Sequence, residues 1–260
     1  MALEGKVAIV TGASRGIGAD IARHLGGLGV AVAVAARSEQ EPDPRLPGTI
    51  HSVVQEIEDA GGRALAVRTN VRYIEDTQAL VDATVAEFGR LDILVNNAGI
   101  TFQGGVEEIP LERLELIWQI DLRAPIVLCR QAIPHMRAGG GGHIINVSSN
   151  AARPIGAAPY ERPRTGSFIY SAFKAGLNRF NEQLARDLHY DGSRISCNVL
   201  SPMGRLKTPG NLYAGRDHGD PLEFEVAEAM AKATAWICEQ PPEFSGHVLW
   251  DQELCDAQGL

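Results

Sequence analysis

Residues Lys6 to Gly18 read Lys-Val-Ala-Ile-Val-Thr-Gly-Ala-Ser-Arg-Gly-Ile-Gly, and this stretch decides the fold. Its first part, Lys6–Val10, is a short apolar run rich in β-branched residues, which predicts a buried strand. The glycine-rich segment Thr11–Gly18 follows, and an amphipathic helical pattern continues to about Leu28. The segment therefore predicts a strand, a tight turn and a helix.

The glycines at positions 12, 16 and 18 suit this turn to a phosphate-bearing ligand. Glycine permits the tight turn, the close approach of the backbone to a pyrophosphate and close packing of the helix. The amino terminus of the helix offers free N–H groups and positive potential to phosphates. An ordinary glycine-rich turn is the alternative, but the strand before it and the helix after it favour a nucleotide site.

Short apolar runs alternate with longer helical patterns along the rest of the chain, which predicts parallel β-α-β units. Runs without polar alternation indicate strands that helices cover on both faces. We therefore expect an α/β fold, a Rossmann-type doubly wound parallel sheet, with residues 1–260 as a single nucleotide-binding domain. The further strand candidates are Val30–Ala35, Ala64–Arg68, Ile93–Asn96, His143–Val147, Ile195–Leu200 and Phe244–Trp250.

Composition agrees with one domain of this class. The chain has 260 residues, 45% of them hydrophobic, which is enough to bury a full core. A formal net charge of -8 argues against nucleic acid or an anionic membrane as a partner. We expect no metal site because the seven histidines are scattered.

Cysteine usage and the amino terminus bear on where the protein works. The four cysteines lack paired C-x-x-C spacing and suit a reducing compartment as buried small residues. The amino terminus enters a strand without a basic and then apolar leader, and no apolar run is long enough to cross a bilayer. These features predict a cytoplasmic protein without membrane association.

A second informative stretch is Tyr170-Ser-Ala-Phe-Lys174, in a segment with a helical pattern. Residues at i and i+4 share one helical face, so the phenol and the ammonium point at the same volume. A positive charge beside a phenol favours the phenolate. The pair therefore predicts a group that donates and accepts a proton at neutral pH.

Four motifs in this order resemble the short-chain dehydrogenase/reductase family: Thr11-Gly12-x-x-x-Gly16-x-Gly18, Asn96-Asn97-Ala98-Gly99, Ser149, and Tyr170-x-x-x-Lys174. The resemblance covers nearly the whole chain. A closer likeness, to the hydroxysteroid-dehydrogenase-like subgroup, rests on the segment from Ala35-Ala-Arg-Ser38 through Arg45–His51 to Glu56–Ala64. That subgroup is defined mostly by sequence, so it narrows the fold more than the reaction.

The resemblance implies roles for particular residues. Ser149 would hold the substrate oxygen, Tyr170 would pass a proton, and Lys174 would bind the nicotinamide ribose and favour the phenolate. Ser148 is the alternative serine. The implied cofactor-binding residues are Gly12, Ser14, Arg15, Gly16, Ile17, Gly18, Arg37, Asn70, Val71, Asn97, Ala98, Gly99, Tyr170, Lys174, Pro202 and Thr208.

The choice of nicotinamide cofactor depends on the end of the second strand. A carboxylate there would bind the ribose 2′-hydroxyl of NAD, but the strand ends Ala35-Ala36-Arg37. Arg37 together with Arg15 could fork onto a 2′-phosphate. NADP(H) is therefore favoured. The alternative is an exposed Arg37 with Arg15 packed over the adenine, which leaves NAD(H) usable as well.

Two features depart from the family pattern. Asp121 stands where the family usually has an asparagine whose backbone carbonyl holds a water of the proton relay, and we count it with the catalytic residues. Its carboxylate could draw the Lys174 ammonium away from the tyrosine. The Ser149 to Tyr170 connection is also long, and Tyr160, Arg162 and Arg164 are candidates for a pocket wall or a subunit contact.

Three loop-like segments are predicted. Glu39–Pro47 and Arg153–Ser167 are surface excursions, the second a substrate-loop insertion near 153–167, and a polar segment near 203–221 is typical of a substrate lid or a plain loop. In the lid, Met203, Leu206, Leu212 and Tyr213 suggest an apolar substrate.

The expected function is NAD(P)(H)-dependent interconversion of a carbonyl and a secondary alcohol by hydride transfer, on a small-molecule substrate, with NADP(H) favoured. One alternative is a cofactor-binding sensor or assembly protein with impaired turnover, which Asp121 would explain. A narrower alternative is a 3-oxoacyl thioester reductase whose arginine-rich insertion binds a phosphate. By resemblance alone, a homodimer or homotetramer is expected.

Overall fold

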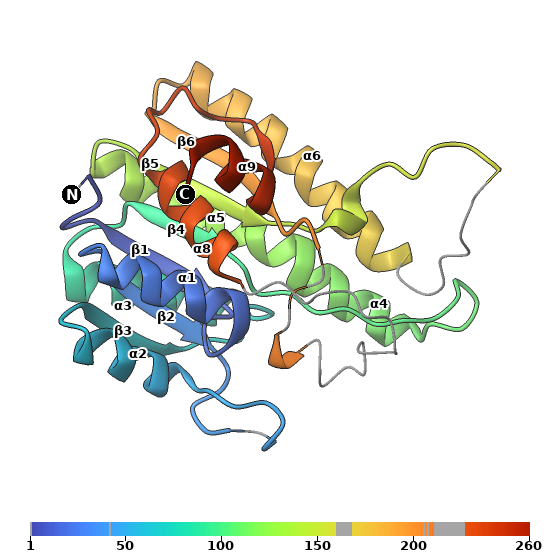
Figure 1. The fold of residues 1–260 in the computed structure, drawn as a ribbon, viewed down its shortest axis with the longest axis horizontal. Helices are drawn as coiled ribbons and strands as arrows, with labels where there is room; N and C mark the ends of the chain where they lie inside the picture. The colour runs from blue at the N-terminus through green and yellow to red at the C-terminus, as the bar shows by residue number, and fades with distance from the viewer. Residues whose placement is uncertain (1, 42, 160–167, 205, 207, 211–226) are drawn as a thin grey trace.

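Seven parallel strands form one sheet in the order β3-β2-β1-β4-β5-β6-β7 (Figure 1). The computed structural model describes residues 2–41, 43–159, 168–204, 206, 208–210 and 227–260. The strands are β1 (Val7–Thr11), β2 (Ala31–Ala36), β3 (Arg63–Arg68), β4 (Ile93–Asn96), β5 (Gly142–Val147), β6 (Ile195–Ser201) and β7 (Val248–Trp250). The predicted doubly wound parallel sheet is confirmed, and six of the strands begin within one residue of the expected position.

The last strand is shorter than predicted. Phe244 was expected in β7, but its ring stacks on His247 at 4.1 Å between centroids, and β7 begins only at Val248. Asn198 of β6 explains the late start, because its side chain donates to the Phe244 carbonyl and accepts from the His247 N–H. These bonds hold 244–247 as a turn instead of a strand.

Helices cover both faces of the sheet, as expected for strands without polar alternation (Figure 1). On one face, α1, α2 and α8 contribute Ile21, Val53 and Met230 to a buried apolar cluster. On the other face, α3, α5 and α6 contribute Leu80, Leu128 and Leu188. The helices are α1 (Gly16–Gly27), α2 (Ile50–Asp59), α3 (Ile74–Phe88), α4 (Leu111–Trp118), α5 (Ala124–Ala138), α6 (Phe168–Tyr190), α8 (Glu228–Cys238) and α9 (Asp251–Gln258).

The strand order reverses between β1 and β4, and side chains join the ends of these two strands. The Thr11 hydroxyl donates to the Val95 carbonyl (3.2 Å) and accepts from the N–H groups of Asn97 (3.0 Å) and Ala98 (3.1 Å). The Asn97 side chain donates to the Thr11 carbonyl at 2.8 Å. In open α/β sheets, ligands bind in the crevice at such a switch point.

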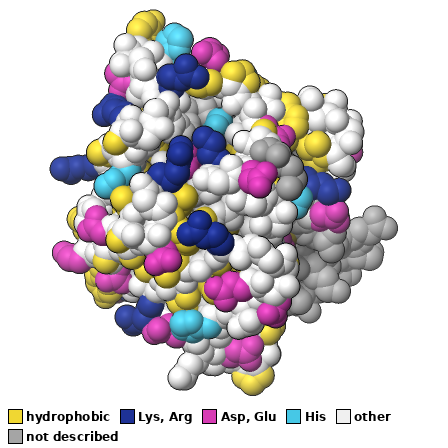
Figure 2. Space-filling model, turned by 90° about the vertical axis from the view of Figure 1, so that its left-hand side faces the viewer, with side chains coloured by type: hydrophobic (Ala, Val, Ile, Leu, Met, Phe, Trp, Pro, Cys, Tyr) yellow, Lys and Arg dark blue, Asp and Glu magenta, His cyan; other side chains and the backbone are white. Residues whose placement is uncertain are grey.

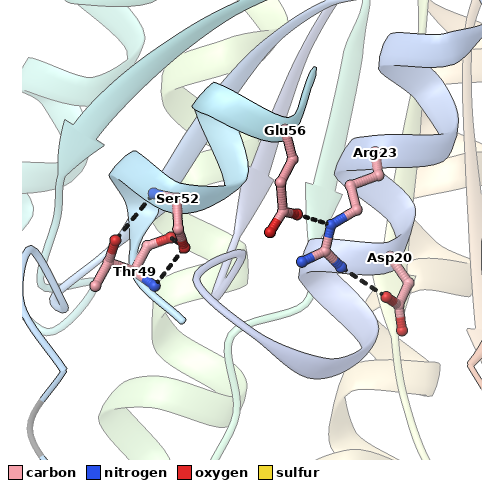
Figure 3. A network of polar contacts seen from close by, with 5 residues as sticks. All are labelled: Asp20, Arg23, Thr49, Ser52 and Glu56. Atoms are coloured by element: carbon pink, nitrogen blue, oxygen red, sulfur yellow. Dashed lines mark hydrogen bonds and ion pairs between the residues drawn. The ribbon is translucent and has the colours of Figure 1, made fainter. Parts of the chain in front are cut away.

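Helix α2 is fixed at its start and along its side (Figure 3). Thr49 and Ser52 form a reciprocal capping box, each side chain accepting from the other's backbone N–H. Arg23 of α1 binds Glu56 of α2 and Asp20 of its own helix. The expected surface excursion Glu39–Pro47 is therefore followed by a helix start that these bonds fix in place.

The surface shown in Figure 2, on the side where the chain begins, carries basic, acidic and hydrophobic side chains in a mixture. None of the described helices is long and apolar enough to cross a membrane. Of the two predicted substrate loops, residues 160–167, 205, 207 and 211–221 lie outside the described residues, and so do Tyr160, Arg162, Arg164, Leu212 and Tyr213.

Gly18 tests how tightly the first turn packs. A Cβ at this position would lie 2.4 Å from the Asn97 Nδ2 and 2.6 Å from the Gly12 carbonyl oxygen. We predict that Gly18→Ala lowers the free energy of unfolding by about 1–3 kcal/mol, because backbone must move. Chemical denaturation measures this difference.

Gly27, the last residue of the same helix, is the matched control, since a Cβ there meets nothing within 4 Å. Gly27→Ala is expected to leave stability unchanged or to raise it by roughly 0.5–1 kcal/mol. Equal losses of stability in both variants would contradict the packing argument.

Candidate active site

A cavity of ≈ 860 Å³ opens at the carboxyl ends of the strands, beside the β1/β4 switch point. This volume is within the range of small-molecule and cofactor sites. Thirteen of the predicted cofactor residues line it: Gly12, Ser14, Arg15, Gly16, Ile17, Gly18, Arg37, Asn70, Val71, Asn97, Ala98, Gly99 and Thr208. Pro202, Tyr170 and Lys174 are not among the lining residues.

The first turn of α1 faces this cavity as an anion site would require. Gly16 has φ +56°, a left-handed conformation that glycine adopts without strain. Within the described part of the chain, the N-cap residue Arg15 gives α1 no side-chain capping bond. The first N–H groups of a helix need an acceptor from elsewhere, so the turn fits a bound pyrophosphate.

The two arginines predicted to bind one phosphate together differ in their hydrogen bonds and in their exposure. Arg15 donates to the backbone carbonyls of Pro47 (3.1 Å, from Nε) and Gly48 (2.7 Å, from Nη2). Burial lowers the pKa of Arg15, Glu41 raises it, and Arg37 lowers it further. Arg37 is exposed at the end of β2 and lines the cavity. Arg15 thus holds the segment 39–48, and Arg37 lies at the part of the cavity beside the end of β2.

Several lining residues were not predicted from the sequence. Leu46, from the segment read as a surface excursion, lines the cavity, as do Thr69 after β3 and Ser38 after β2. At the other end, Phe102 and Arg113 line it, with the Arg113 guanidinium 4.8 Å from the Phe102 ring centroid. The sequence signal for Leu46 was an apolar side chain in a segment otherwise rich in proline and charge. The presence of the other residues in the cavity wall depends on tertiary packing.

Lys174 is buried at the carboxyl end of β5. Its ammonium donates to the Val147 carbonyl at 2.9 Å and lies 3.3 Å from Asp121 Oδ1 and 5.7 Å from the centroid of the Tyr170 ring. Burial lowers the pKa of Lys174, but the charges of Asp121 and Tyr170 raise it more, and the net shift is upward. The lysine is therefore held as a cation.

A five-residue π-helix, Gln119–Arg123, places Asp121 beside this lysine. Such wide turns inside helices often mark functional sites. Asp121 is fully buried, and its Oδ2 accepts from the Ile100 N–H at 3.1 Å. Burial raises the pKa of Asp121, and Lys174 lowers it, with a net upward shift. Among the described residues Oδ1 has no well-directed hydrogen bond, so its 3.3 Å contact with Lys174 is an ion pair.

Gly99 separates the cavity from the charged pair. A Cβ at this position would lie 3.0 Å from Asp121 Oδ1 and 3.6 Å from Lys174 Nζ. Because Gly99 lines the cavity, the ammonium sits directly behind its wall. The helical spacing also brings Tyr170, which is half-buried, to the lysine's face of α6.

The two candidate serines differ in access. Ser148 is buried, and its hydroxyl donates to the Lys174 carbonyl at 3.4 Å. Ser149 is half-buried, and its hydroxyl accepts from the Ala151 N–H at 3.1 Å, which leaves its own O–H to donate elsewhere. Access favours Ser149 as the serine for a substrate oxygen.

Comparison with curated proteins finds relatives over almost the whole chain. An uncharacterized oxidoreductase of Methylorubrum extorquens is 38% identical over 246 residues, which is 95% of this chain and 90% of that protein. Hydroxysteroid dehydrogenase-like protein 2 of Danio rerio is 32% identical over 99% of this chain. The chain spans 60% of the length of that longer relative.

Comparison with solved structures also finds similar proteins over almost the whole chain. A short chain dehydrogenase of Mycobacterium thermoresistibile has a TM-score of 0.84 and 32% identity, covering 99% of this chain and 89% of that one. A metagenomic short-chain oxidoreductase in complex with NADP has a TM-score of 0.76 and 30% identity, covering 96% and 98%. The family model described as short chain dehydrogenase matches residues 6–216. With its parallel sheet, glycine turn and Tyr170–Lys174 pair in place, this chain belongs to the short-chain dehydrogenase family.

Proposed function

We propose that the protein interconverts a carbonyl and a secondary alcohol by hydride transfer, with NADP(H) as the preferred cofactor. The observation that carries the proposal is the Lys174 cation, fixed to the Val147 carbonyl directly behind the cavity wall, with Tyr170 on the same face of α6. A phenol on the same helical face as a buried cation can donate and accept a proton in catalysis. The glycine turn and the free first turn of α1 fit a dinucleotide.

Each residue then has a defined task. The nicotinamide cofactor, when bound, supplies the hydride. Ser149 donates a hydrogen bond to the substrate oxygen, and Tyr170 gives that oxygen a proton as negative charge grows on it. Lys174 stabilises the phenolate that remains, and its burial strengthens this attraction because few water dipoles screen it.

The NADP(H) preference rests on Arg37 more than on Arg15. Arg37 is exposed beside the adenosine end of the cavity, whereas Arg15 already donates to two carbonyls. Arginine suits phosphate because its donors form a planar fork. A similar structure, the metagenomic oxidoreductase, contains NADP, which supports this choice by analogy.

Tyr170→Phe tests the reaction. We predict that the purified protein oxidises NADPH with members of a panel of ketones, steroids and 3-oxoacyl thioesters, and that the substitution lowers kcat by about 100-fold or more, since it removes the proton donor. NADPH binding, followed by fluorescence, is expected to change little. Binding of NADPH without turnover on any member would favour a cofactor sensor, in which Asp121 has disabled the relay.

Arg37→Ala tests cofactor choice. Loss of a charged hydrogen bond is expected to weaken NADPH binding roughly 10- to 100-fold and to leave NADH binding unchanged. Arg15→Ala is the comparison, and it is expected to weaken the binding of both cofactors by a similar factor, because it releases the segment 39–48, whose Leu46 lines the cavity. Calorimetric titration with each cofactor gives the four dissociation constants. If Arg15→Ala weakened the binding of NADPH and left that of NADH unchanged, the result would favour the predicted pair, in which Arg15 and Arg37 bind the 2′-phosphate together.

Asp121→Asn tests the ion pair through pH. Asp121 raises the pKa of Lys174, so its removal lowers that pKa and the lysine loses its proton at lower pH. The alkaline limb of the kcat/KM profile is expected to move to lower pH in the variant. Glu182→Gln, an exposed carboxylate on α6 paired with Arg179, is the control and is expected to leave the profile unchanged. An unchanged limb in Asp121→Asn would show that the pair does not control the reaction.

The proposal also includes an apolar substrate, a homo-oligomeric state and a reducing compartment. Phe102 in the cavity wall supports an apolar substrate, whereas Leu206 packs in the apolar core. Exposed apolar side chains such as Ile126 and Phe168, on α5 and α6, support a homo-oligomer. The four cysteines are free and buried, which supports a reducing compartment such as the cytoplasm.

A further inference from the structure

Met203, in the turn after β6, is held from two distant segments at once. Its N–H donates to Asp251 Oδ1 at 2.8 Å, and its carbonyl accepts from Asn150 Nδ2 at 3.2 Å. Its sulfur lies 3.6 Å from the Arg153 guanidinium. We call Asn150, Arg153, Met203 and Asp251 the Met203 clasp. It joins the turn that begins at Ser149 to the start of α9.

The C-terminal half of the clasp is a buried carboxylate. Asp251 is fully buried, and its Oδ1 accepts from the N–H groups of both Met203 and Gln252, each at 2.8 Å. Burial raises the pKa of Asp251, and the two backbone donors lower it, with a net upward shift. An exposed acid or hydroxyl would stabilise the start of a helix equally well. The bond from Met203, 48 positions earlier, indicates that Asp251 also holds the turn after β6.

The other half of the clasp is the turn of Ser149. Residues Asn150–Ala152 form a 3-10 turn in which the Ala152 N–H donates to the Ser149 carbonyl (2.9 Å) and the Arg153 N–H to the Asn150 carbonyl (3.1 Å). Residues at both ends of this turn reach Met203 through their side chains. The Arg153 guanidinium also lies 4.1 Å from the Trp250 ring centroid and 3.5 Å from a Glu253 carboxylate oxygen.

We propose that Asp251 and Asn150 are positioning residues, which fix the Ser149 turn to the C-terminal segment Trp250–Glu253 through Met203. The buried Asp251 bond is the stronger half, because water competes with the exposed Asn150 amide. The role of Ser149 rests on the function proposed above, whereas the mechanical coupling does not. The C-terminal segment thereby controls where the serine hydroxyl points.

Hydrogen exchange tests the coupling without reference to activity. The amides of Ala151, Ala152 and Arg153 each donate a hydrogen bond within the serine turn, so they report its order. In Asp251→Ala we expect these amides to exchange about tenfold faster. Asp251→Asn keeps an acceptor oxygen and is expected to restore most of the protection. Asp256→Ala, an exposed acid on α9 bonded to Gln252, is the control without effect.

Asn150→Ala supplies the reciprocal measurement if Asp251→Ala does not fold, since Asn150 is exposed and its loss removes one surface bond. It is expected to speed exchange of the Met203 amide. Faster exchange at Met203 in Asp251→Ala with unchanged amides at 151–153 would overturn the proposal, because Asp251 would then hold only its own turn. Unchanged exchange at Met203 in Asn150→Ala would overturn it equally.

Kinetics separate the clasp from the proposed function. In an active enzyme, Asn150→Ala is expected to lower kcat more than it changes KM, and Asp251→Asn to keep most of the kcat that Asp251→Ala loses. A kcat equal to that of the wild-type enzyme in Asn150→Ala, Asp251→Asn and Asp251→Ala would overturn the positioning role. A wild-type protein without turnover on the carbonyl panel would contradict the proposed function alone, because hydrogen exchange still decides the clasp.

Discussion

The ammonium of Lys174 at the Val147 carbonyl is the interaction on which the site depends. A cation this deeply buried requires compensation, since its desolvation costs several kcal/mol. The parallel sheet supplies part of it, because the carboxyl end of β5 presents the Val147 carbonyl oxygen to α6. Asp121 supplies the rest as a counter-charge from the π-helix between α4 and α5. Sheet, helix and π-turn must all be in register for the lysine to remain charged.

A chain of buried amides keeps α6 in that register. Asn96 of β4 donates to Asn146 of β5 at 2.9 Å, and Asn146 donates to Asn181 of α6 at 3.1 Å. Asn181 in turn donates to the Cys197 carbonyl of β6 at 3.3 Å. Buried polar networks of this kind specify one arrangement, because a shifted helix would leave amides unpaired. The network therefore fixes the helix that carries Tyr170 and Lys174.

Local patterns made much of this predictable. The glycine turn, the strand runs and the Tyr170–Lys174 spacing depend on residues within one or two turns of each other, so the sequence indicates them directly. Arg15 lines the cavity, but its guanidinium also donates to the carbonyls of Pro47 and Gly48, which only the folded path of the 39–48 segment brings near. The sequence did not predict the short β7 or the Met203 clasp for the same reason, because Asn198, Asn150 and Asp251 bind partners about 50 residues away. Side chains that bridge distant segments leave no periodic signal.

The central claim is that Lys174 remains a cation inside the protein, and its protonation state can be measured directly. The chain has four lysines, at positions 6, 174, 207 and 232, so carbon-13 labelling at lysine Cε gives a simple spectrum in which Lys174→Arg assigns the buried residue. The account predicts the chemical shift of a protonated amine for Lys174 throughout roughly pH 6 to 9. A Lys174 signal that shows a neutral amine at pH 7 would contradict it.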